Sequence, residues 1–210
     1  MSRTAIGRET EQRILASGLS IASERGLNGV SLGILAERSG LSKSGLFAHF
    51  GSKEDLQLRL LKAAEAALRR QVVEPATAAS AGLPRLLELM RLWLGWAARA
   101  GLPGGCPLYA AAFELDDADG GPVRDYLVSS HREWMATLTS LVQEAVDLHH
   151  LPAGTDAAQV AWELNGIYLA HHVGQRLIGD NSVDARAQAA LQALLGTDSL
   201  NPGHGPENQS

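Results

Sequence analysis

Residues 30–56 read VSLGILAERSGLSKSGLFAHFGSKEDL, and this stretch decides the fold. It predicts two short helices joined by a tight turn and followed by the start of a third helix. Ser31 is placed to cap the first helix and Gly40 to end it, because glycine adopts the left-handed conformation at a helix terminus at little cost. Ser42 is placed to cap the second helix, and the Ser-x-x-Asp pattern of residues 52–55 predicts a capping box for the third. Few architectures need this pattern, and one of them reads DNA.

The second helix of the pair, about residues 42–49, is too short to be stable alone in water. Leu46 and Phe50 are its inward residues. Its outward side is small, polar, aromatic and basic, without an acid, and this suits a recognition helix in the major groove. A lysine on that side favours guanine acceptors, and a lysine beside the next helix N-terminus favours phosphate. The predicted DNA-contacting residues are Ser31, Ser42, Lys43, Ser44, Phe47, His49 and Lys53.

At these residues the chain resembles the helix-turn-helix of the TetR/AcrR family of bacterial transcriptional regulators. The family pattern is a hydroxyl-capped helix ending in Ala-Gly, a Val-Ser turn, then Lys-Gly-Thr-Leu-Tyr and an aromatic-Phe pair before Ser-Lys-Glu. Here the segment reads AERSGLSKSGLFAHFGSKEDL, residues 36–56, and the resemblance covers about residues 10–60. Phe47 stands where the family usually has Tyr, so a hydroxyl contact to phosphate is lost. Ser44-Gly45 replaces the usual Gly-Thr, so base contacts of typical members are not carried over.

The charge distribution agrees with DNA binding, although the chain as a whole has a net charge of −5. Residues 1–53 hold seven Lys and Arg against four Glu, which gives +3 and leaves −8 for the remainder. A basic N-terminal part on an acidic body fits a chain in which one domain meets phosphates and another does not.

Beyond the motif, apolar residues recur with the helical period and strand-like alternation is absent, so we expect an all-α protein of about nine helices. Besides the two helices of the motif, helices are expected at about residues 10–25, 53–73, 84–100, 107–115, 122–149, 156–178 and 184–195. Three regions are predicted: a three-helix helix-turn-helix domain at residues 1–52, a helical ligand-binding and dimerisation domain at 53–196, and a polar, disordered tail at 197–210.

Large aromatic residues gather on the helices predicted between residues 84 and 178. Ordinary core packing explains any one of them. As a set, however, they fall on the elements that enclose the ligand cavity in the family that the chain resembles. Aromatic walls with a few polar groups suit an apolar or aromatic small molecule. The predicted ligand-binding residues are Trp93, Trp96, Tyr109, Phe113, His131, Trp134, Trp162 and Asn165.

The predicted helix at residues 156–178 is apolar nearly all round, so it must be covered on more than one side. The last helix, 184–195, carries an apolar stripe at i, i+3 and i+4. These two helices can pair with their copies as a four-helix bundle, an arrangement that the resemblance also implies. The predicted dimer-interface residues are Ile167, His171, Leu191 and Leu194.

Other functional sites are not predicted. The doublets His149-His150 and His171-His172 point about 100° apart on a helix and rarely supply two ligands to one ion, so we expect no metal and no cofactor. The chain has no Gly-rich phosphate loop and no Ser elbow, so we do not expect an enzyme. The single cysteine, Cys106, is expected to be a small buried apolar residue. Two alternatives stay open: a thiol-based redox sensor through Cys106, and a helical small-molecule-binding protein or enzyme that does not bind DNA.

These observations predict a homodimeric one-component regulator that binds double-stranded operator DNA with a palindromic sequence. The absence of an apolar run of about 18 residues and of an apolar signal region leads us to expect a cytoplasmic protein with no membrane partner. The resemblance implies repression as the commoner behaviour, with a ligand displacing the helix that starts at Lys53 and changing the separation of the two DNA-binding parts. The effector, the operator, the regulated genes and the sign of regulation are left open.

Overall fold

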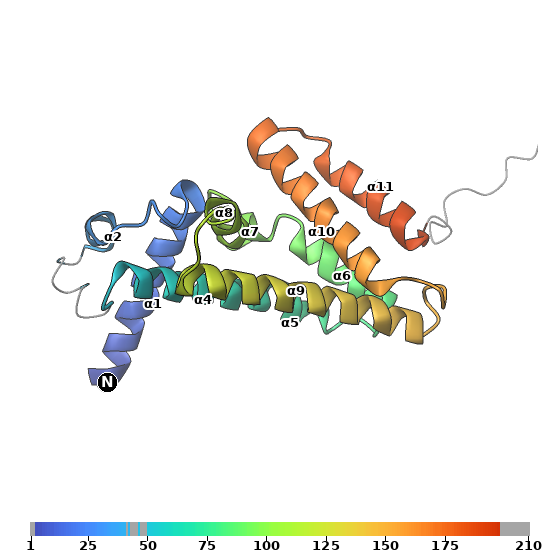
Figure 1. Ribbon diagram of the computed structural model, residues 1–210, viewed down its shortest axis with the longest axis horizontal. Helices are drawn as coiled ribbons and strands as arrows, with labels where there is room; N and C mark the ends of the chain where they lie inside the picture. The colour runs from blue at the N-terminus through green and yellow to red at the C-terminus, as the bar shows by residue number, and fades with distance from the viewer. Residues whose placement is uncertain (1–2, 41, 43–45, 47–49, 198–210) are drawn as a thin grey trace, which may run out of the picture. The chain divides into compact units, whose positions relative to one another are not determined.

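The computed structural model describes residues 3–40, 42, 46 and 50–197, with residues 3–8 described by their backbone only. All regular structure in these ranges is helical, which confirms the predicted all-α class (Figure 1). The helices are α1 (Arg3–Arg25), α2 (Leu32–Ser39), α4 (Lys53–Leu68), the π-helix η1 (Arg69–Val73), α5 (Glu74–Ala76), α6 (Leu83–Trp93), α7 (Trp96–Arg99), α8 (Pro107–Glu114), α9 (Pro122–Asp147), α10 (Ala157–Val173), the π-helix η2 (Gly174–Ile178) and α11 (Val183–Leu195). Counted with the continuations η1, α5 and η2, the helices of the described ranges number nine.

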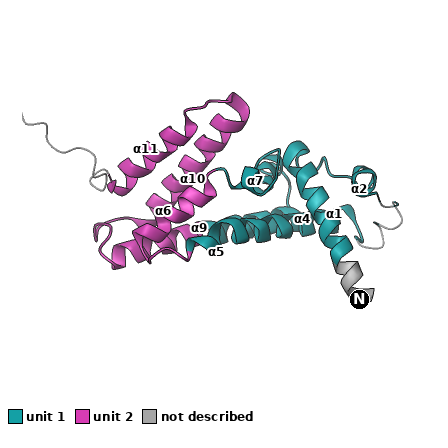
Figure 2. Ribbon diagram, turned by 180° about the vertical axis from the view of Figure 1, so that it is seen from behind, with its two compact units in different colours: residues 1–76, 95–134 teal, residues 77–94, 135–210 magenta. Residues whose placement is uncertain are grey.

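The chain divides into two compact units (Figure 2). Unit 1 comprises residues 1–76 and 95–134, and unit 2 comprises residues 77–94 and 135–210. The boundaries predicted from the sequence, 1–52 and 53–196, separate the helix-turn-helix from the rest. The contacts instead group the helix-turn-helix region with α4, α7, α8 and the first half of α9.

Unit 1 is built around the packing of α1 against α2, α4 and α8. The two residues predicted to face inward, Leu46 and Phe50, are completely buried, as are Ile14 of α1 and Leu35 of α2. Gly18 allows α1 to approach α4 closely, since a Cβ at this position would lie 2.6 Å from a methyl carbon of Leu60. The first helix of the motif, α2, is therefore supported by packing against α1.

Unit 2 contains α6, the second half of α9, and the hairpin of α10 and α11. Asp156 caps α10 by accepting from the amides of Ala158 and Gln159, both at 3.0 Å. The inner face of α11 carries Val183, Ala187, Leu191 and Leu195, which recur every fourth residue and are all buried. This period places one stripe of α11 in the core of its own protomer.

The prediction of a single helix at about residues 84–100 is wrong. Its apolar residues do have the helical period, but α6 ends at Trp93 and α7 begins at Trp96. Gly95 has φ of +70° and Leu94 has ψ of 120°, so the backbone leaves the helical conformation at both residues. The break coincides with the boundary between the units, so Trp93 and Trp96 belong to different units.

Other helix boundaries differ by smaller amounts. α1 begins at Arg3 rather than near Thr10, and the helix that starts at Lys53 continues through η1 and past Pro75 to Ala76. α9 ends at Asp147, two residues before the predicted end, because His149 adopts φ of +59°. Of the predicted tail, Thr197 is buried and residues 198–210 lie outside the described residues.

Throughout the described ranges, no helix has both the length and the apolar character needed to cross a membrane.

Candidate functional site

The first helix of the motif, α2, has the ends that the sequence predicts. Ser31 lies in an extended conformation and its hydroxyl oxygen accepts from the amide of Ile34 at 3.2 Å. Gly40 ends the helix in the left-handed conformation, with φ of +68°. Because the cap uses only the oxygen of Ser31, its hydroxyl hydrogen is still able to donate to a phosphate at this helix end.

In the second helix of the motif, the structure describes Ser42, Leu46 and Phe50. The amide of Leu46 donates to the carbonyl of Ser42 at 3.1 Å, and the amide of Phe50 donates to the carbonyl of Leu46 at 2.9 Å. Leu46 and Phe50 are buried and Ser42 is exposed, as predicted. Each of these bonds spans four residues, which is the spacing of α-helical hydrogen bonds. The predicted DNA-contacting residues Lys43, Ser44, Phe47 and His49 lie outside the described residues.

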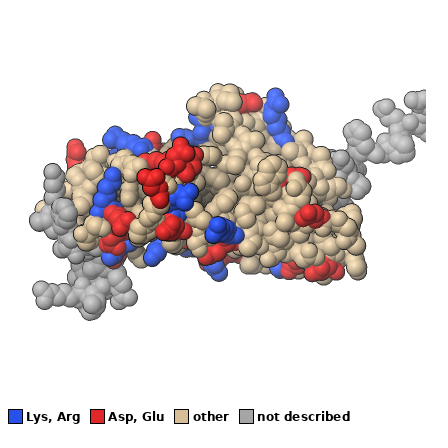
Figure 3. All heavy atoms as spheres, in the orientation of Figure 1, with Lys and Arg blue, Asp and Glu red and all other residues tan. Residues whose placement is uncertain are grey.

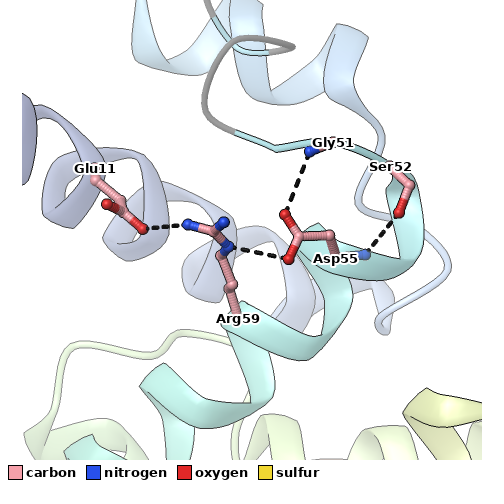
Figure 4. A network of polar contacts seen from close by, with 5 residues as sticks. All are labelled: Glu11, Gly51, Ser52, Asp55 and Arg59. Atoms are coloured by element: carbon pink, nitrogen blue, oxygen red, sulfur yellow. Dashed lines mark hydrogen bonds and ion pairs between the residues drawn. The ribbon is translucent and has the colours of Figure 1, made fainter.

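The start of α4 is fixed by a polar network that the sequence only partly predicts (Figure 4). The hydroxyl of Ser52 accepts from the amide of Asp55 at 3.0 Å, which is one half of the predicted capping box. In the other half, Asp55 accepts from the amide of Gly51 at 3.3 Å, one residue before the cap. Arg59 then donates to Asp55 at 3.1 Å and to Glu11 on α1 at 2.7 Å.

Arg59 joins three parts of the DNA-binding region. Besides its two carboxylate partners, its guanidinium carbon lies 5.4 Å from the centre of the Phe50 ring, at the end of the second motif helix. The hydrogen bond from Arg59 holds the pKa of the Asp55 carboxyl below its ordinary value, with further lowering by the Gly51 amide. Arg59 is not among the predicted site residues, although the spacing of four residues between Asp55 and Arg59 on a helix is a sequence signal for such a pair.

The loop that leads into α2, residues 26–29, is held by α4. The ammonium of Lys53 donates to the carbonyl of Asn28 at 3.4 Å. Gln57 donates to the carbonyl of Leu27 at 3.5 Å and to the side-chain oxygen of Asn28 at 3.2 Å. An ammonium has three donors, so the bond to Asn28 uses one of the three donors of Lys53.

The same loop is held from a second side by α8. One carboxylate oxygen of Glu114 accepts from the amide of Leu27 at 2.6 Å, and the other accepts from the amide of Asn28 at 2.8 Å. Gly26 has φ of +73°, and a Cβ at this position would lie 2.8 Å from the Glu114 carboxylate. The role of Glu114 could not be predicted from local sequence patterns, because its partners are 86 and 87 residues away along the chain.

Acidic and basic side chains alternate over the face of unit 1 shown in Figure 3. Arg38 pairs with Glu24 at 3.5 Å, and Arg59 pairs with Glu11 and Asp55. Arg13 and Arg38 line a small groove of about 140 Å³ between α1 and α2, together with Thr10, Ile14, Ser17 and Ser39. Two arginines of the DNA-binding region, Arg38 and Arg59, are therefore paired with carboxylates.

The predicted ligand-binding residues are distributed over both units. Trp96, Tyr109, Phe113, His131 and Trp134 belong to unit 1, and Trp93, Trp162 and Asn165 belong to unit 2. In unit 1, the rings of Tyr109 and His131 meet edge to face with centroids 6.1 Å apart, and burial raises the pKa of Tyr109. Trp96 is completely buried, whereas Phe113 is 59 % exposed.

In unit 2, the ring of Trp93 stacks on Tyr168 with centroids 4.1 Å apart and an angle of 5° between the planes. His172 continues the stack at 6.1 Å from Tyr168, and burial lowers the pKa of His172. Asn165 is buried on the same helix. The structure thus groups Trp93 with Tyr168 and His172, two residues that the sequence analysis did not assign to a ligand site. Trp162, in contrast, is 66 % exposed.

The predicted dimer-interface residues occupy different environments within the protomer. Leu191 is buried on the inner stripe of α11, and His171 is buried with its Nε2 atom 2.7 Å from a carboxylate oxygen of Asp184. Ile167 and Leu194 are partly exposed. The large apolar side chains that α10 and η2 leave exposed are instead Trp162, Val173, Leu177 and Ile178.

Cys106 is buried immediately before α8, as expected for a small apolar residue. In the part of the chain that the structure describes, no group of three or more His, Cys, Asp or Glu side chains is arranged to hold a metal ion.

Two family models match the chain. The model described as "Bacterial regulatory proteins, tetR family" matches residues 14–60. The model described as "Tetracyclin repressor-like, C-terminal domain" matches residues 82–191, more than half of the chain. No curated protein matches the chain.

Solved structures share the fold. A TetR transcriptional regulator from Chloroflexus aurantiacus is 22 % identical with a TM-score of 0.80, and the alignment covers 93 % of this chain and 96 % of that one. A TetR-family regulator from Cytophaga hutchinsonii is 19 % identical with a TM-score of 0.78, covering 94 % and 96 %. AibR, solved with isovaleryl coenzyme A and operator DNA, is 18 % identical with a TM-score of 0.70, covering 89 % and 98 %.

Proposed function

Because the chain belongs to the TetR family of bacterial transcriptional regulators, we propose that it is a homodimeric repressor in the cytoplasm that releases its operator when a small molecule binds. Two copies of the helix-turn-helix enter successive major grooves of a palindromic site, roughly 34 Å apart. The effector acts by binding the released state more tightly than the DNA-bound state.

The observation that supports this proposal is the capping and packing of the helix-turn-helix. Ser31 caps α2, Gly40 ends it, and Leu46 and Phe50 anchor the second helix in the core. We propose that Ser42, Lys43, Ser44, Phe47 and His49 meet the major groove, and that Ser31 and Lys53 contact phosphates.

The experiment is selection of DNA from a random pool by the full-length protein, followed by affinity measurements over a range of salt concentrations. Lys43→Ala should lower the affinity for the selected operator. Loss of a base contact should cost about 1–3 kcal/mol and relax one position, whereas loss of a phosphate contact should reduce the salt slope by about one unit. Lys62→Ala is the matched control, because Lys62 is an exposed lysine of α4 that faces the ring of Tyr126. Failure of the wild-type protein to enrich any sequence would contradict DNA recognition.

We propose that α10 and α11 form the dimer interface. The exposed apolar residues of α10 and η2 support this, because a soluble protomer rarely leaves such a cluster uncovered. Trp162, Val173 and Leu177 follow one another at intervals of 11 and 4 residues, which places them on one side of the helix. Ile167 and Leu194, which are partly exposed, are able to join the same interface.

We propose that the effector is an apolar or aromatic molecule recognised by the aromatic residues of α6 and α10. The stack of Trp93, Tyr168 and His172, with Asn165 on the same helix, supplies flat apolar walls and a few polar groups. AibR, which shares the fold, was solved with isovaleryl coenzyme A, a small acyl group on a large polar carrier. Fluorescence titration of the four tryptophans with a compound library provides the screen.

A further inference from the structure

The loop at residues 26–29 lies at the entrance to the helix-turn-helix. It follows the end of α1 at Arg25 and leads through Val30 to the cap of α2 at Ser31. Its carbonyls and the Asn28 side chain accept from Lys53 and Gln57 of α4, and its amides donate to Glu114 of α8. Two helices from different parts of the chain therefore set the position of one short loop.

Of the two sets of hydrogen bonds, those to Glu114 of α8 hold the loop more strongly than those from α4. The Glu114 carboxylate makes two charge-assisted hydrogen bonds, at 2.6 and 2.8 Å, to successive amides. On the α4 side, Gln57 donates two neutral bonds at 3.2 and 3.5 Å, and the Lys53 ammonium donates one bond at 3.4 Å, longer than those to Glu114. Leu27 is only 3 % exposed, so its amide has little access to water if the carboxylate is removed.

The backbone is shaped to receive this carboxylate. Gly26 leaves open the space that a Cβ would occupy, 2.8 Å from Glu114. At the other end of α8, the amide of Gly104 donates to the hydroxyl of Ser23 on α1 at 3.0 Å. A Cβ at Gly104 would lie 1.7 Å from the carbonyl oxygen of Ser23. The segment that contains α8 is thus attached to the end of α1 at two places.

Glu114 also connects the two regions that the family models match separately. The loop lies within the matched residues 14–60, and Glu114 lies within the matched residues 82–191. Tyr109 and Phe113, two of the predicted ligand-binding residues, are on the same helix as Glu114. A ligand that shifts α8 would therefore shift the acceptor of the Leu27 and Asn28 amides.

We propose that Glu114 is a positioning residue for DNA binding, which holds the 26–29 loop to α8 and transmits displacement of α8 to the start of α2. This link is separate from the covalent connection through α4. The inference rests on the proposed function, since it assumes that the helix-turn-helix binds an operator and that the effector acts on α8.

The test uses full-length wild-type protein, Glu114→Gln and the control Asp117→Asn. Both variants remove one negative charge from the same region, and Asp117 is exposed in the turn after α8. By long-range electrostatics, each loss should slightly strengthen binding to DNA. If Glu114 positions the loop, Glu114→Gln should instead weaken operator binding about tenfold, with an unchanged salt slope because no phosphate contact is lost. Affinities are measured well below the melting temperature of each variant.

Hydrogen exchange at the Leu27 and Asn28 amides gives a second readout that does not depend on DNA. Both amides should exchange faster in Glu114→Gln and at the wild-type rate in Asp117→Asn. The proposal is overturned if Glu114→Gln binds the operator as tightly as Asp117→Asn, or if its affinity falls while the two amides exchange as in the wild type. If the wild type selects no DNA, the proposed function fails. Faster exchange in Glu114→Gln would still establish that Glu114 holds the loop to α8.

Discussion

Arg59 and Glu114 illustrate how single charged side chains organise the DNA-binding region. Arg59 reaches α1 through Glu11 and the start of α4 through Asp55, and Glu114 reaches the loop before α2. Each makes charge-assisted hydrogen bonds, which are stronger than hydrogen bonds between neutral groups. The orientation of the motif therefore depends on residues outside the helices that would touch DNA.

The Asp55 carboxyl should titrate at a pH below its ordinary pKa of 3.8, because the ionised form accepts from Arg59 and Gly51. A lowered folded-state pKa contributes stability that is present above about pH 4 and is lost as the pH falls through that lowered pKa. Arg59→Gln should return the pKa of Asp55 toward 3.8, as measured from its carboxyl carbon chemical shift. Arg91→Gln, which removes the partner of Glu88 in unit 2, should leave Asp55 unchanged. An Asp55 pKa that does not rise in Arg59→Gln would count against the network.

Gly104→Ala should destabilise the protein strongly. The added methyl group would lie 1.7 Å from a backbone oxygen of Ser23, so the backbone of one segment must move. We expect a loss of about 1–3 kcal/mol or more in the free energy of unfolding, measured by denaturant titration. Gly154→Ala is the control, because no heavy atom lies within 4 Å of the position of its Cβ. Equal stability of the two variants would show that the contact between Gly104 and α1 adjusts without cost.

Among the helices, α10 and α11 separate their two roles by face. The inner stripe of α11 is buried in the protomer, whereas Leu177 and Ile178 of η2 are 82 % and 70 % exposed. Val183 packs against Gly174. A Cβ at Gly174 would lie 2.6 Å from a methyl carbon of Val183. The hairpin therefore closes tightly on one side and leaves apolar side chains on the other.

Leu177→Glu and Leu191→Glu should give different results if α10 and α11 form the dimer interface. Leu177→Glu places a charge among the exposed apolar side chains of α10 and η2. This variant should be a folded monomer in sedimentation and should bind the operator more weakly. Leu191→Glu buries a charge in the protomer and should unfold it or strongly lower its melting temperature. Leu177→Glu protein that remains dimeric at micromolar concentration would place the interface elsewhere.

In the whole molecule, an effector and the operator must influence each other by the same free energy, because linkage is reciprocal. A compound that changes tryptophan fluorescence should therefore weaken operator binding by a certain factor. The operator should weaken binding of the compound by the same factor. Trp93→Ala should weaken the effector more than the DNA, since Trp93 lies in unit 2 and the helix-turn-helix lies in unit 1. Trp93→Phe keeps a ring to stack on Tyr168 and is the matched control. Melting curves separate lost contact from lost stability, because truncating a buried tryptophan costs about 3–5 kcal/mol.

This prediction also distinguishes the effector from a thiol switch. Cys106 is buried, and the chain has no second cysteine. Release of the operator only after oxidation, with no compound that shifts both fluorescence and affinity, would move the sensing role to Cys106.

Local patterns were sufficient to predict the helix-turn-helix, its caps and the all-α class. Ser31, Gly40 and Ser52 act on amides or backbone angles within three residues of themselves, so their effects can be read along the chain. The inward positions of Leu46 and Phe50 follow from the helical period in the same way. Asp156 was likewise placed correctly at the start of its helix.

Long-range packing decided the features that these patterns could not reach. The turn at Leu94 and Gly95 divides a stretch whose apolar period continues unbroken, because Trp93 packs in unit 2 and Trp96 in unit 1. The carboxylate of Glu114 finds its amides nearly ninety residues away, and Leu191 rather than Leu177 faces the core of the protomer. Periodicity shows that a helix has an apolar face, but only the packed neighbours determine which protein surface covers it.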